Sequence, residues 1–102
     1  MITYDQARQL GKAYVAALNT GDAGYAALFA PGARVTLGGA PADPGGVRAT
    51  VPVGRAGFRG VDLAAPHVVV TLRVIDAARE AVDDRIHRLV LDDEGRISAL
   101  EA

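Results

Sequence analysis

The stretch TYDQARQLGKAYVAALNTGD, residues 3–22, predicts the helix on which the rest of the fold is built. Thr3 and Gln6 have the spacing of a capping box, in which each side chain satisfies a free backbone amide at the start of a helix. We therefore expect a helix that begins near Tyr4 and ends in the Asn-Thr-Gly-Asp sequence of residues 19–22, where glycine suits the left-handed closing position. Apolar residues recur at steps of three and four along it, and they form one buried stripe made of Ala7, Leu10, Tyr14, Ala17 and Leu18.

The residues after this helix predict a second helix and a first strand. A short helix is expected over residues 23–30, where Tyr25, Leu28 and Phe29 would be buried. Proline and glycine then mark a turn, and residues 34–37 have the composition of a strand.

The middle of the chain is rich in glycine and proline. Residues 38–46 contain too many of both for a regular element, so we expect a loop there. Residues 47–53 alternate loosely and are compatible with a strand, which Pro52 would confine to a sheet edge. Residues 54–60 include three glycines, so at most one helical turn around Phe58 is expected.

The last third of the chain predicts antiparallel strands. Residues 67–76 favour a strand whose core face is Val68, Val70, Leu72 and Val74, whereas residues 77–81 are compatible with a helical turn or a strand connection. Residues 85–91 and 96–100 flank an acidic turn that contains glycine, which is typical of a hairpin. Helices that come first and strands that follow predict an α+β domain with helices covering one face of a curved sheet.

The composition narrows the classes of function. With 102 residues, half of them hydrophobic, the chain can bury one core, so residues 1–102 are predicted to be one domain. Its 11 basic and 12 acidic residues are scattered, which gives no basic stripe for nucleic acid. The absence of cysteine excludes disulfides and thiolate chemistry. We expect no signal peptide, no membrane-spanning segment and a cytoplasmic location.

Two separated patterns resemble one known family. Residues 13–22, 27–31 and 33–35 are similar to the opening of the SnoaL-like and ketosteroid isomerase branch of the nuclear-transport-factor-2-like (NTF2-like) superfamily, and residues 86–97 resemble its final hairpin. Together they cover about half of the chain. The resemblance implies a cone of N-terminal helices packed on a curved, mainly antiparallel sheet, with the family's third helix shortened or missing between Leu37 and Pro66.

The resemblance also implies roles for particular residues. In ketosteroid isomerase an Asp base moves a proton while a Tyr and a protonated Asp hold the enolate oxygen. Tyr14 matches the tyrosine donor, and the position of the second acid falls near His87. The position of the base falls at or beside Leu37 or Gly38, neither of which can accept a proton. Asp43 is the carboxylate that would replace this base if its loop folds inward, and the alternative is a solvated turn residue.

These residues lead to two hypotheses of function. The first is a small-molecule pocket protein, possessing isomerase, cyclase or dehydratase activity on an apolar, oxygen-bearing substrate, with Tyr14, His87 and Asp43 as catalytic residues. The second is a non-catalytic module that binds a ligand or dimerises through the outer face of its sheet, in which Tyr14 and His87 are structural residues. Both predict a homodimer, no metal site and no cofactor. The pocket wall is expected to consist of Leu18, Phe29, Val35, Leu37, Phe58, Leu89 and Leu100.

Overall fold

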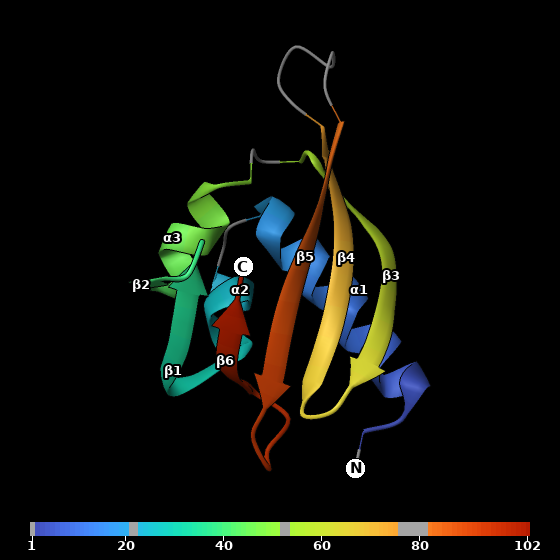
Figure 1. The fold of residues 1–102 in the computed structure, drawn as a ribbon, viewed down its shortest axis with the longest axis vertical. Coiled ribbons are helices and arrows are strands. Elements are labelled where there is room, and N and C mark those ends of the chain that lie inside the picture. The colour runs from blue at the N-terminus through green and yellow to red at the C-terminus, as the bar shows by residue number, and fades with distance from the viewer. Residues whose placement is uncertain (1, 21–22, 52–53, 76–81) are drawn as a thin grey trace.

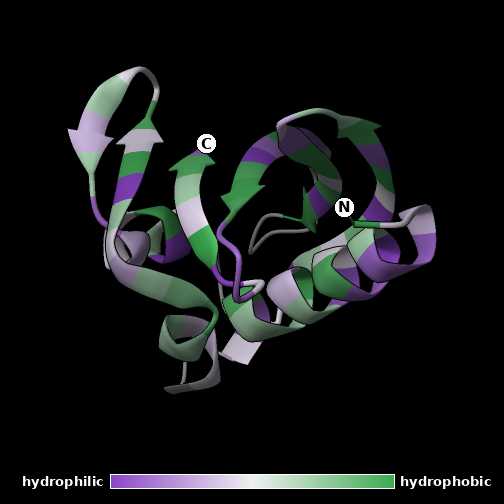
Figure 2. Cartoon of the chain, turned by 90° about the horizontal axis from the view of Figure 1, so that it is seen from below, coloured by the Kyte–Doolittle hydropathy of each residue, from purple (hydrophilic) through white to green (hydrophobic). Residues whose placement is uncertain are grey.

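The computed structural model describes residues 2–20, 23–51, 54–75 and 82–102, and in these parts of the chain helices lie on the concave side of one curved sheet (Figure 1). In chain order the elements are α1 (Tyr4–Thr20), α2 (Ala23–Ala27), β1 (Phe29–Leu37), β2 (Ala40–Ala42), α3 (Pro44–Ala49), β3 (Ala56–Ala64), β4 (His67–Ile75), β5 (Val82–Leu91) and β6 (Ile97–Glu101). The strand order is β2-β1-β6-β5-β4-β3, and only the β1/β6 pair is parallel. The expected α+β cone is confirmed, and Figure 2 shows the sheet curving around α1.

Helix α1 begins with the expected capping box. The Thr3 amide donates to Oε1 of Gln6 at 2.9 Å, and the Gln6 amide donates to Oγ1 of Thr3 at 3.1 Å. At the other end, the side chain of Asn19 donates to the Ala56 carbonyl at 2.7 Å and accepts from the Ala56 amide at 2.8 Å. These two bonds fasten the last turn of α1 to the start of β3. The glycine and aspartate predicted to join the first two helices, residues 21–22, lie outside the described residues.

The prediction of a helix over residues 23–30 is wrong at its end. Helix α2 stops at Ala27, and Phe29 already pairs with Ile97 of β6 in the parallel ladder. The Leu28 carbonyl accepts a hydrogen bond from the Ile97 amide at 2.8 Å. Pairing with β6 therefore replaces the helical hydrogen bond that this carbonyl would otherwise accept. The proline and glycine at residues 31–32 make an irregularity within β1 instead of ending an element.

The predicted loop over residues 38–46 contains two regular elements. Gly38 and Gly39 both have positive φ, as the central pair of a two-residue hairpin requires, and they join β1 to the short strand β2. Asp43 then caps α3, because its side chain accepts a hydrogen bond from the Gly46 amide at 2.6 Å, and proline occupies the first turn. The possible strand over residues 47–53 does not form in residues 47–51, because α3 continues to Ala49, and residues 52–53 lie outside the described residues. The third helix is present in the shortened form that the resemblance implied.

The residues around Phe58 form a long strand, β3, and not a helical turn. This strand pairs along its whole length with β4, with an irregularity between Phe58 and Gly60. Phe58 packs against Gly11 of α1 so closely that a Cβ on Gly11 would lie 2.8 Å from Cε1 of Phe58. The residues of this segment have a low intrinsic preference for a strand. Pairing with β4 and contact with α1 stabilise the strand nevertheless.

The C-terminal strands match the prediction closely. In β4 the expected residues Val68, Val70, Leu72 and Val74 are buried and alternate with more exposed positions. The hairpin between β5 and β6 turns at Asp92, whose carboxylate accepts hydrogen bonds from the amides of Glu94 and Arg96, both at 2.9 Å. Residues 77–81, for which two structures were compatible with the sequence, lie outside the described residues.

Candidate functional site

The structure brings Tyr14 and His87 together in the interior. The hydroxyl of Tyr14 lies 2.6 Å from Nδ1 of His87, and their rings meet edge to face with centroids 5.7 Å apart. Helix α1 places Tyr14 in its buried stripe, and β5 turns His87 toward the same interior as Leu89. Among the described residues, His87 is the one buried charged or polar side chain apart from the tyrosines, with 2% of its surface exposed.

Burial keeps both partners in their neutral forms. Desolvation, followed by the nearby Tyr25, raises the pKa of Tyr14 well above its ordinary value. Desolvation, followed by the positive charge of Arg85, lowers the pKa of His87 to about 4. The hydroxyl of Tyr14 and Nδ1 of His87 share one hydrogen bond, whose direction depends on the imidazole tautomer. In the tautomer that carries its proton on Nε2, Tyr14 donates to Nδ1 and Nε2 can donate to a ligand.

A hollow of about 460 Å³ adjoins His87, and we call it the His87 hollow. It lies where the ends of β1 and β6 meet the C-terminal end of α3 and residues 85–87 of β5. Its wall is made of Leu37, Gly38, Thr50, Arg85, Ile86, His87 and Ala102. The main-chain oxygen of Ala102 is bound to the Gly38 amide at 3.0 Å. Leu37 and Gly38, where the resemblance puts the base, thus lie on the same hollow as His87.

Arg85 connects this hollow to α3. Its Nη1 donates to the main-chain carbonyl of Thr50 at 2.8 Å and to Oγ1 of Thr50 at 3.2 Å, and its Nε donates to Asp83 at 2.7 Å. Sequence reasoning missed Arg85 and Thr50. The period of two along β5 offered a signal for Arg85, because a residue two positions before His87 faces the same side of the sheet.

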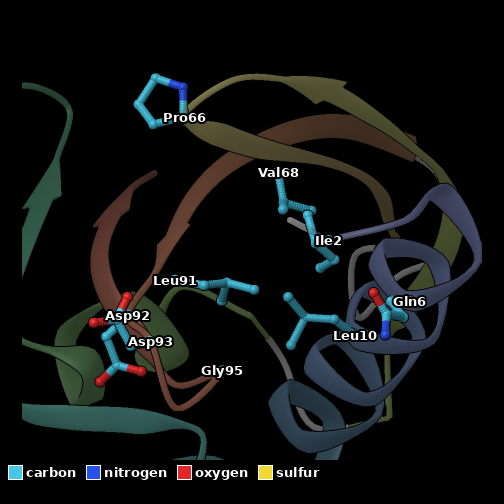
Figure 3. A pocket seen from close by; sticks show the side chains of 9 residues that line it. All are labelled: Ile2, Gln6, Leu10, Pro66, Val68, Leu91, Asp92, Asp93 and Gly95. Atoms are coloured by element: carbon cyan, nitrogen blue, oxygen red, sulfur yellow. The ribbon is translucent and has the colours of Figure 1, made fainter.

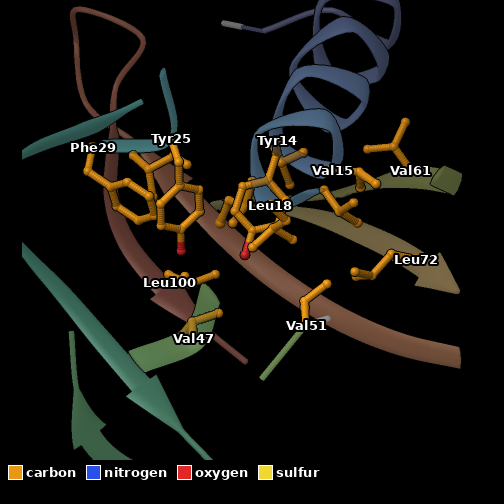
Figure 4. Close-up of a cluster of buried hydrophobic side chains, with 14 of the residues drawn as sticks. Tyr14, Val15, Leu18, Tyr25, Phe29, Val47, Val51, Val61, Leu72 and Leu100 are labelled. Carbon is orange, nitrogen blue, oxygen red and sulfur yellow. The ribbon is translucent and has the colours of Figure 1, made fainter. Parts of the chain in front are cut away.

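Most of the predicted pocket wall is packed core. Leu18, Phe29, Val35, Leu89 and Leu100 are buried, and none lines the His87 hollow. Figure 4 shows Tyr14 and Tyr25 enclosed by several of these side chains. Of the predicted wall, only Leu37 lines the hollow. Phe58 is half-buried over α1 and does not line the His87 hollow.

Asp43 has a structural task at the start of α3. It is exposed, and its carboxylate accepts the hydrogen bond from the Gly46 amide that caps the helix. No interaction joins it to Tyr14 or His87 in the described structure. Burial raises the pKa of Tyr25, the charge of Arg48 lowers it, and the charge of Asp43 adds a smaller increase. The hydroxyl of Tyr25 donates to the Pro44 carbonyl at 2.8 Å.

A second hollow, of about 600 Å³, lies at the other end of the sheet, and we call it the Asp92 hollow (Figure 3). It is lined by Ile2, Gln6, Leu10, Pro66, Val68, Leu91, Asp92, Asp93 and Gly95. It is the larger hollow, but none of the predicted site residues lines it. The carboxylate of Asp92 is occupied by the turn, and Asp93 is exposed. We therefore place the candidate site at the His87 hollow, which adjoins a buried polar group.

The described residues contain no group of three or more His, Asp or Glu side chains suited to a metal ion. His67 lies on the outer face of β4, with Nε2 4.0 Å from Oε1 of Glu101. Within the described ranges, no helix is long and apolar enough to cross a membrane.

Comparison with known proteins gives likeness in structure alone. No family model and no curated protein matches the chain. A de novo designed protein with a curved β-sheet superposes with a TM-score of 0.76 at 16% identity, covering 98% of this chain and 85% of that chain. A de novo designed NTF2 fold protein gives 0.70 at 15% identity, covering 99% and 85%. A crystal structure named as a "putative polyketide cyclase" from Sinorhizobium meliloti gives 0.71 at 17% identity, covering 98% of each chain.

These likenesses define the class of fold. The chain has the NTF2-like fold, as the N-terminal and C-terminal patterns of the sequence predicted. The fold is shared by designed proteins and by a protein named as a cyclase. Function must therefore be argued from the residues of the site.

Proposed function

We propose that this protein binds a small, largely apolar molecule that carries an oxygen acceptor, with the oxygen held by Nε2–H of His87 in the His87 hollow. The observation that carries the proposal is the buried Tyr14–His87 hydrogen bond beside a hollow. Tyr14 acts as a positioning residue, because its hydroxyl fixes the imidazole tautomer and orientation. Ligand pockets commonly combine an apolar wall with a few well-placed polar groups, which is the character of this site.

A proton-transfer reaction such as isomerisation, cyclisation or dehydration is the second candidate. The specific observation in its favour is a neutral imidazole donor on the wall where a substrate oxygen would gain negative charge. A donor fixed in advance in a site of low dielectric stabilises a developing oxyanion more than water does. In such a reaction His87 is the catalytic residue, and Tyr14 acts through it. Binding is the better supported candidate because it needs only a donor on the wall, whereas proton transfer also needs a base and Asp43 is occupied as a helix cap.

One experiment addresses both candidates with a β,γ-unsaturated ketosteroid and its conjugated isomer as probes. Calorimetry measures the affinity of each probe, and absorbance measures conversion of the first to the second. His87→Leu should weaken binding about tenfold or more, because a hydrogen bond in the site is lost. The matched control is His67→Leu, the same change on the outer face, which should leave binding unaltered. Equal affinity in wild type and His87→Leu would overturn the binding proposal, and His87-dependent binding without conversion would reject isomerase activity on this substrate.

We also propose that two copies of the chain associate through the outer face of the sheet. Ile86 lies on this outer face with 49% of its surface exposed, and it pairs with Thr71 of β4. Val69 and Val90 are half-buried on neighbouring outward positions. Sedimentation at micromolar concentration should show a dimer that Ile86→Lys dissociates. A wild-type monomer at that concentration would refute the association.

A further inference from the structure

We propose that β5 binds an extended peptide segment of another protein chain, which adds to the sheet as a strand in line with β6. The binding surface is the main-chain edge of residues 83–87 that faces the His87 hollow, and we call it the β5 slot. The inference goes beyond the proposed function, because it uses main-chain groups in the layer of the sheet and not the imidazole of His87.

Strand β6 leaves part of β5 unpaired. β5 spans Val82–Leu91, whereas the pairing with β6 stops at Arg88 and Glu101. Figure 1 shows β5 running on past the end of β6. On this side of residues 83–87 no strand pairs with β5 within the described parts of the chain, since β4 lies on the opposite side. The His87 hollow adjoins the unpaired edge and is lined by residues 85–87.

The main-chain hydrogen bonds of Ala102 show which groups of β6 face β5. The Ala102 amide donates to the Thr36 carbonyl at 2.9 Å, and the Ala102 main-chain oxygen accepts from the Gly38 amide at 3.0 Å. Both groups of Ala102 therefore point to β1. Because these directions alternate along a strand, the amide and carbonyl of Glu101 point to β5, where Glu101 is paired with Arg88.

The same alternation assigns the groups that face the β5 slot. The register between β4 and β5 is unbroken, so Ile86 and Asp84 direct their amides and carbonyls to the same side as Arg88. Arg85 and His87 direct theirs to β4. No main-chain partner of Ile86 or Asp84 is found on the slot side among the described residues. An added strand would bind both amides and both carbonyls, which is how peptides join exposed sheet edges.

The two outer edges of the sheet are less suited to an added strand. Strand β2 is short and has Pro41 at its centre, which removes a donor. Strand β3 is irregular between Phe58 and Gly60, and such a bulge turns an edge away from a partner. The β5 slot has no proline and no irregularity in its register with β4.

The charged side chains at the β5 slot already have partners. Charged residues often protect a sheet edge from pairing. Here Asp84 accepts a hydrogen bond from Nε of Arg73 at 2.9 Å, and Asp83 accepts one from Nε of Arg85 at 2.7 Å. Arg85 also donates to the Thr50 carbonyl at 2.8 Å. A strand that enters the slot meets paired charges and does not have to separate them.

The side chains around the slot define the sequence that fits it. Ile86 points to the outer face with 49% of its surface exposed, so a β-branched residue opposite it gains an apolar contact. The alternate residues of the added strand point into the His87 hollow, where Arg85 and Thr50 already contact each other and favour a small side chain. We therefore expect a segment in which β-branched and small residues alternate, without proline opposite Ile86 or Asp84.

Amide hydrogen exchange measured by NMR tests the β5 slot. In the unaltered protein, the amides of Asp84 and Ile86 should exchange at least about tenfold faster than those of Arg85 and His87, relative to their intrinsic rates, because only the second pair is bonded to β4. The capped peptide Val-Ala-Val-Ala-Thr, added at millimolar concentration, should slow exchange at Asp84 and Ile86 and leave the other two amides unchanged.

A tethered form of the same peptide tests the slot without relying on the affinity of a free peptide. The sequence Val-Ala-Val-Ala-Thr is joined directly to Ala102, which raises its effective concentration to about the millimolar range or above. Exchange at Asp84 and Ile86 should then slow about tenfold or more. The matched control has proline in place of both valines, which removes the donors to the carbonyls of Ile86 and Asp84, and it should give no protection.

Each outcome decides one step. Equally slow exchange at all four amides of the unaltered protein would mean that the edge is already covered, and the inference would fail. Equal exchange with the valine tail and the proline tail would exclude an added strand. Protection by the valine tail but none by the free peptide would reject the binding of a separate chain. No ligand of the His87 hollow takes part, so failure here leaves the proposed function untouched.

Discussion

Replacing Tyr14 with phenylalanine removes one buried hydroxyl and leaves the ring in place. The lost hydroxyl is hydrogen-bonded to Nδ1 of His87 at 2.6 Å, and both side chains are buried. The change removes a hydrogen bond with a net value of about 1 kcal/mol and leaves an imidazole nitrogen unsatisfied, which adds about 1 kcal/mol or more. We expect the free energy of unfolding to fall by about 2 kcal/mol, which corresponds to roughly 10 °C in Tm for a domain of this size.

The assay is a double-mutant cycle followed by urea unfolding. Tyr14→Phe and His87→Leu each leave one polar group without its partner, but the double variant removes both. Its loss should therefore be smaller than the sum of the single losses, with a coupling energy of about 1 kcal/mol or more. Tyr4→Phe makes the same change at a side chain that is 52% exposed, and it should alter stability by less than about 0.5 kcal/mol. Single losses that add to within about 0.5 kcal/mol would refute the buried pair.

Three further predictions concern packing, the α1 to β3 contact and pH. Alanine is normally favoured over glycine in helices. Gly11→Ala should nevertheless lower the free energy of unfolding by about 1 kcal/mol, because its Cβ would press on the ring of Phe58. In a protein that also carries Phe58→Leu, thermal unfolding should show that Gly11→Ala is tolerated. Asn19→Ala should lower stability by about 2 kcal/mol in urea unfolding because both bonds to Ala56 are lost, and Asn19→Asp should not restore it, since a carboxylate cannot donate. The pKa of His87 is lowered from 6.5 to about 4, so its contribution to stability is complete above pH 6.5. The free energy of unfolding should decline by on the order of 3 kcal/mol from this residue as the pH falls to about 4. Unfolding across this pH range should show the decline in wild type and not in His87→Leu.

Local patterns predicted the elements whose physical cause is local. The capping box of Thr3 and Gln6 and the spacing of Tyr14 depend only on residues within α1, and both were correct. The errors fall where contacts between distant segments decide the structure. Phe29 enters β1 because β6 pairs with it, and Phe58 lies in a strand because β4 and Gly11 hold it there. Glycine content gave no warning of these contacts, since the same residue type serves turns, irregular strand positions and close packing.

The candidate site was predictable in its partners but not in its hollow. The phase of β5 indicated that His87 faces inward, and the resemblance brought Tyr14 to the same interior. The number and volume of the side chains that fill the cone cannot be read from strand phase alone. Leu18 and Leu89 were expected to line a pocket, but both are fully buried in the hydrophobic core. The open space beside His87 is consequently limited to the His87 hollow.

The short segment after β1 explains why Asp43 does not reach the His87 hollow. The tight turn at Gly38 and Gly39 reverses the chain at once, so that Asp43 is only four residues past Gly39 when α3 must be capped. A carboxylate engaged by the helix it caps is held at the surface, outside the His87 hollow. The same short helix ends at Thr50, whose carbonyl and hydroxyl hold Arg85. One shortening therefore places an acid in a cap and holds Arg85 against the end of α3, and the described side chains that line the hollow include no carboxylate that could remove a proton.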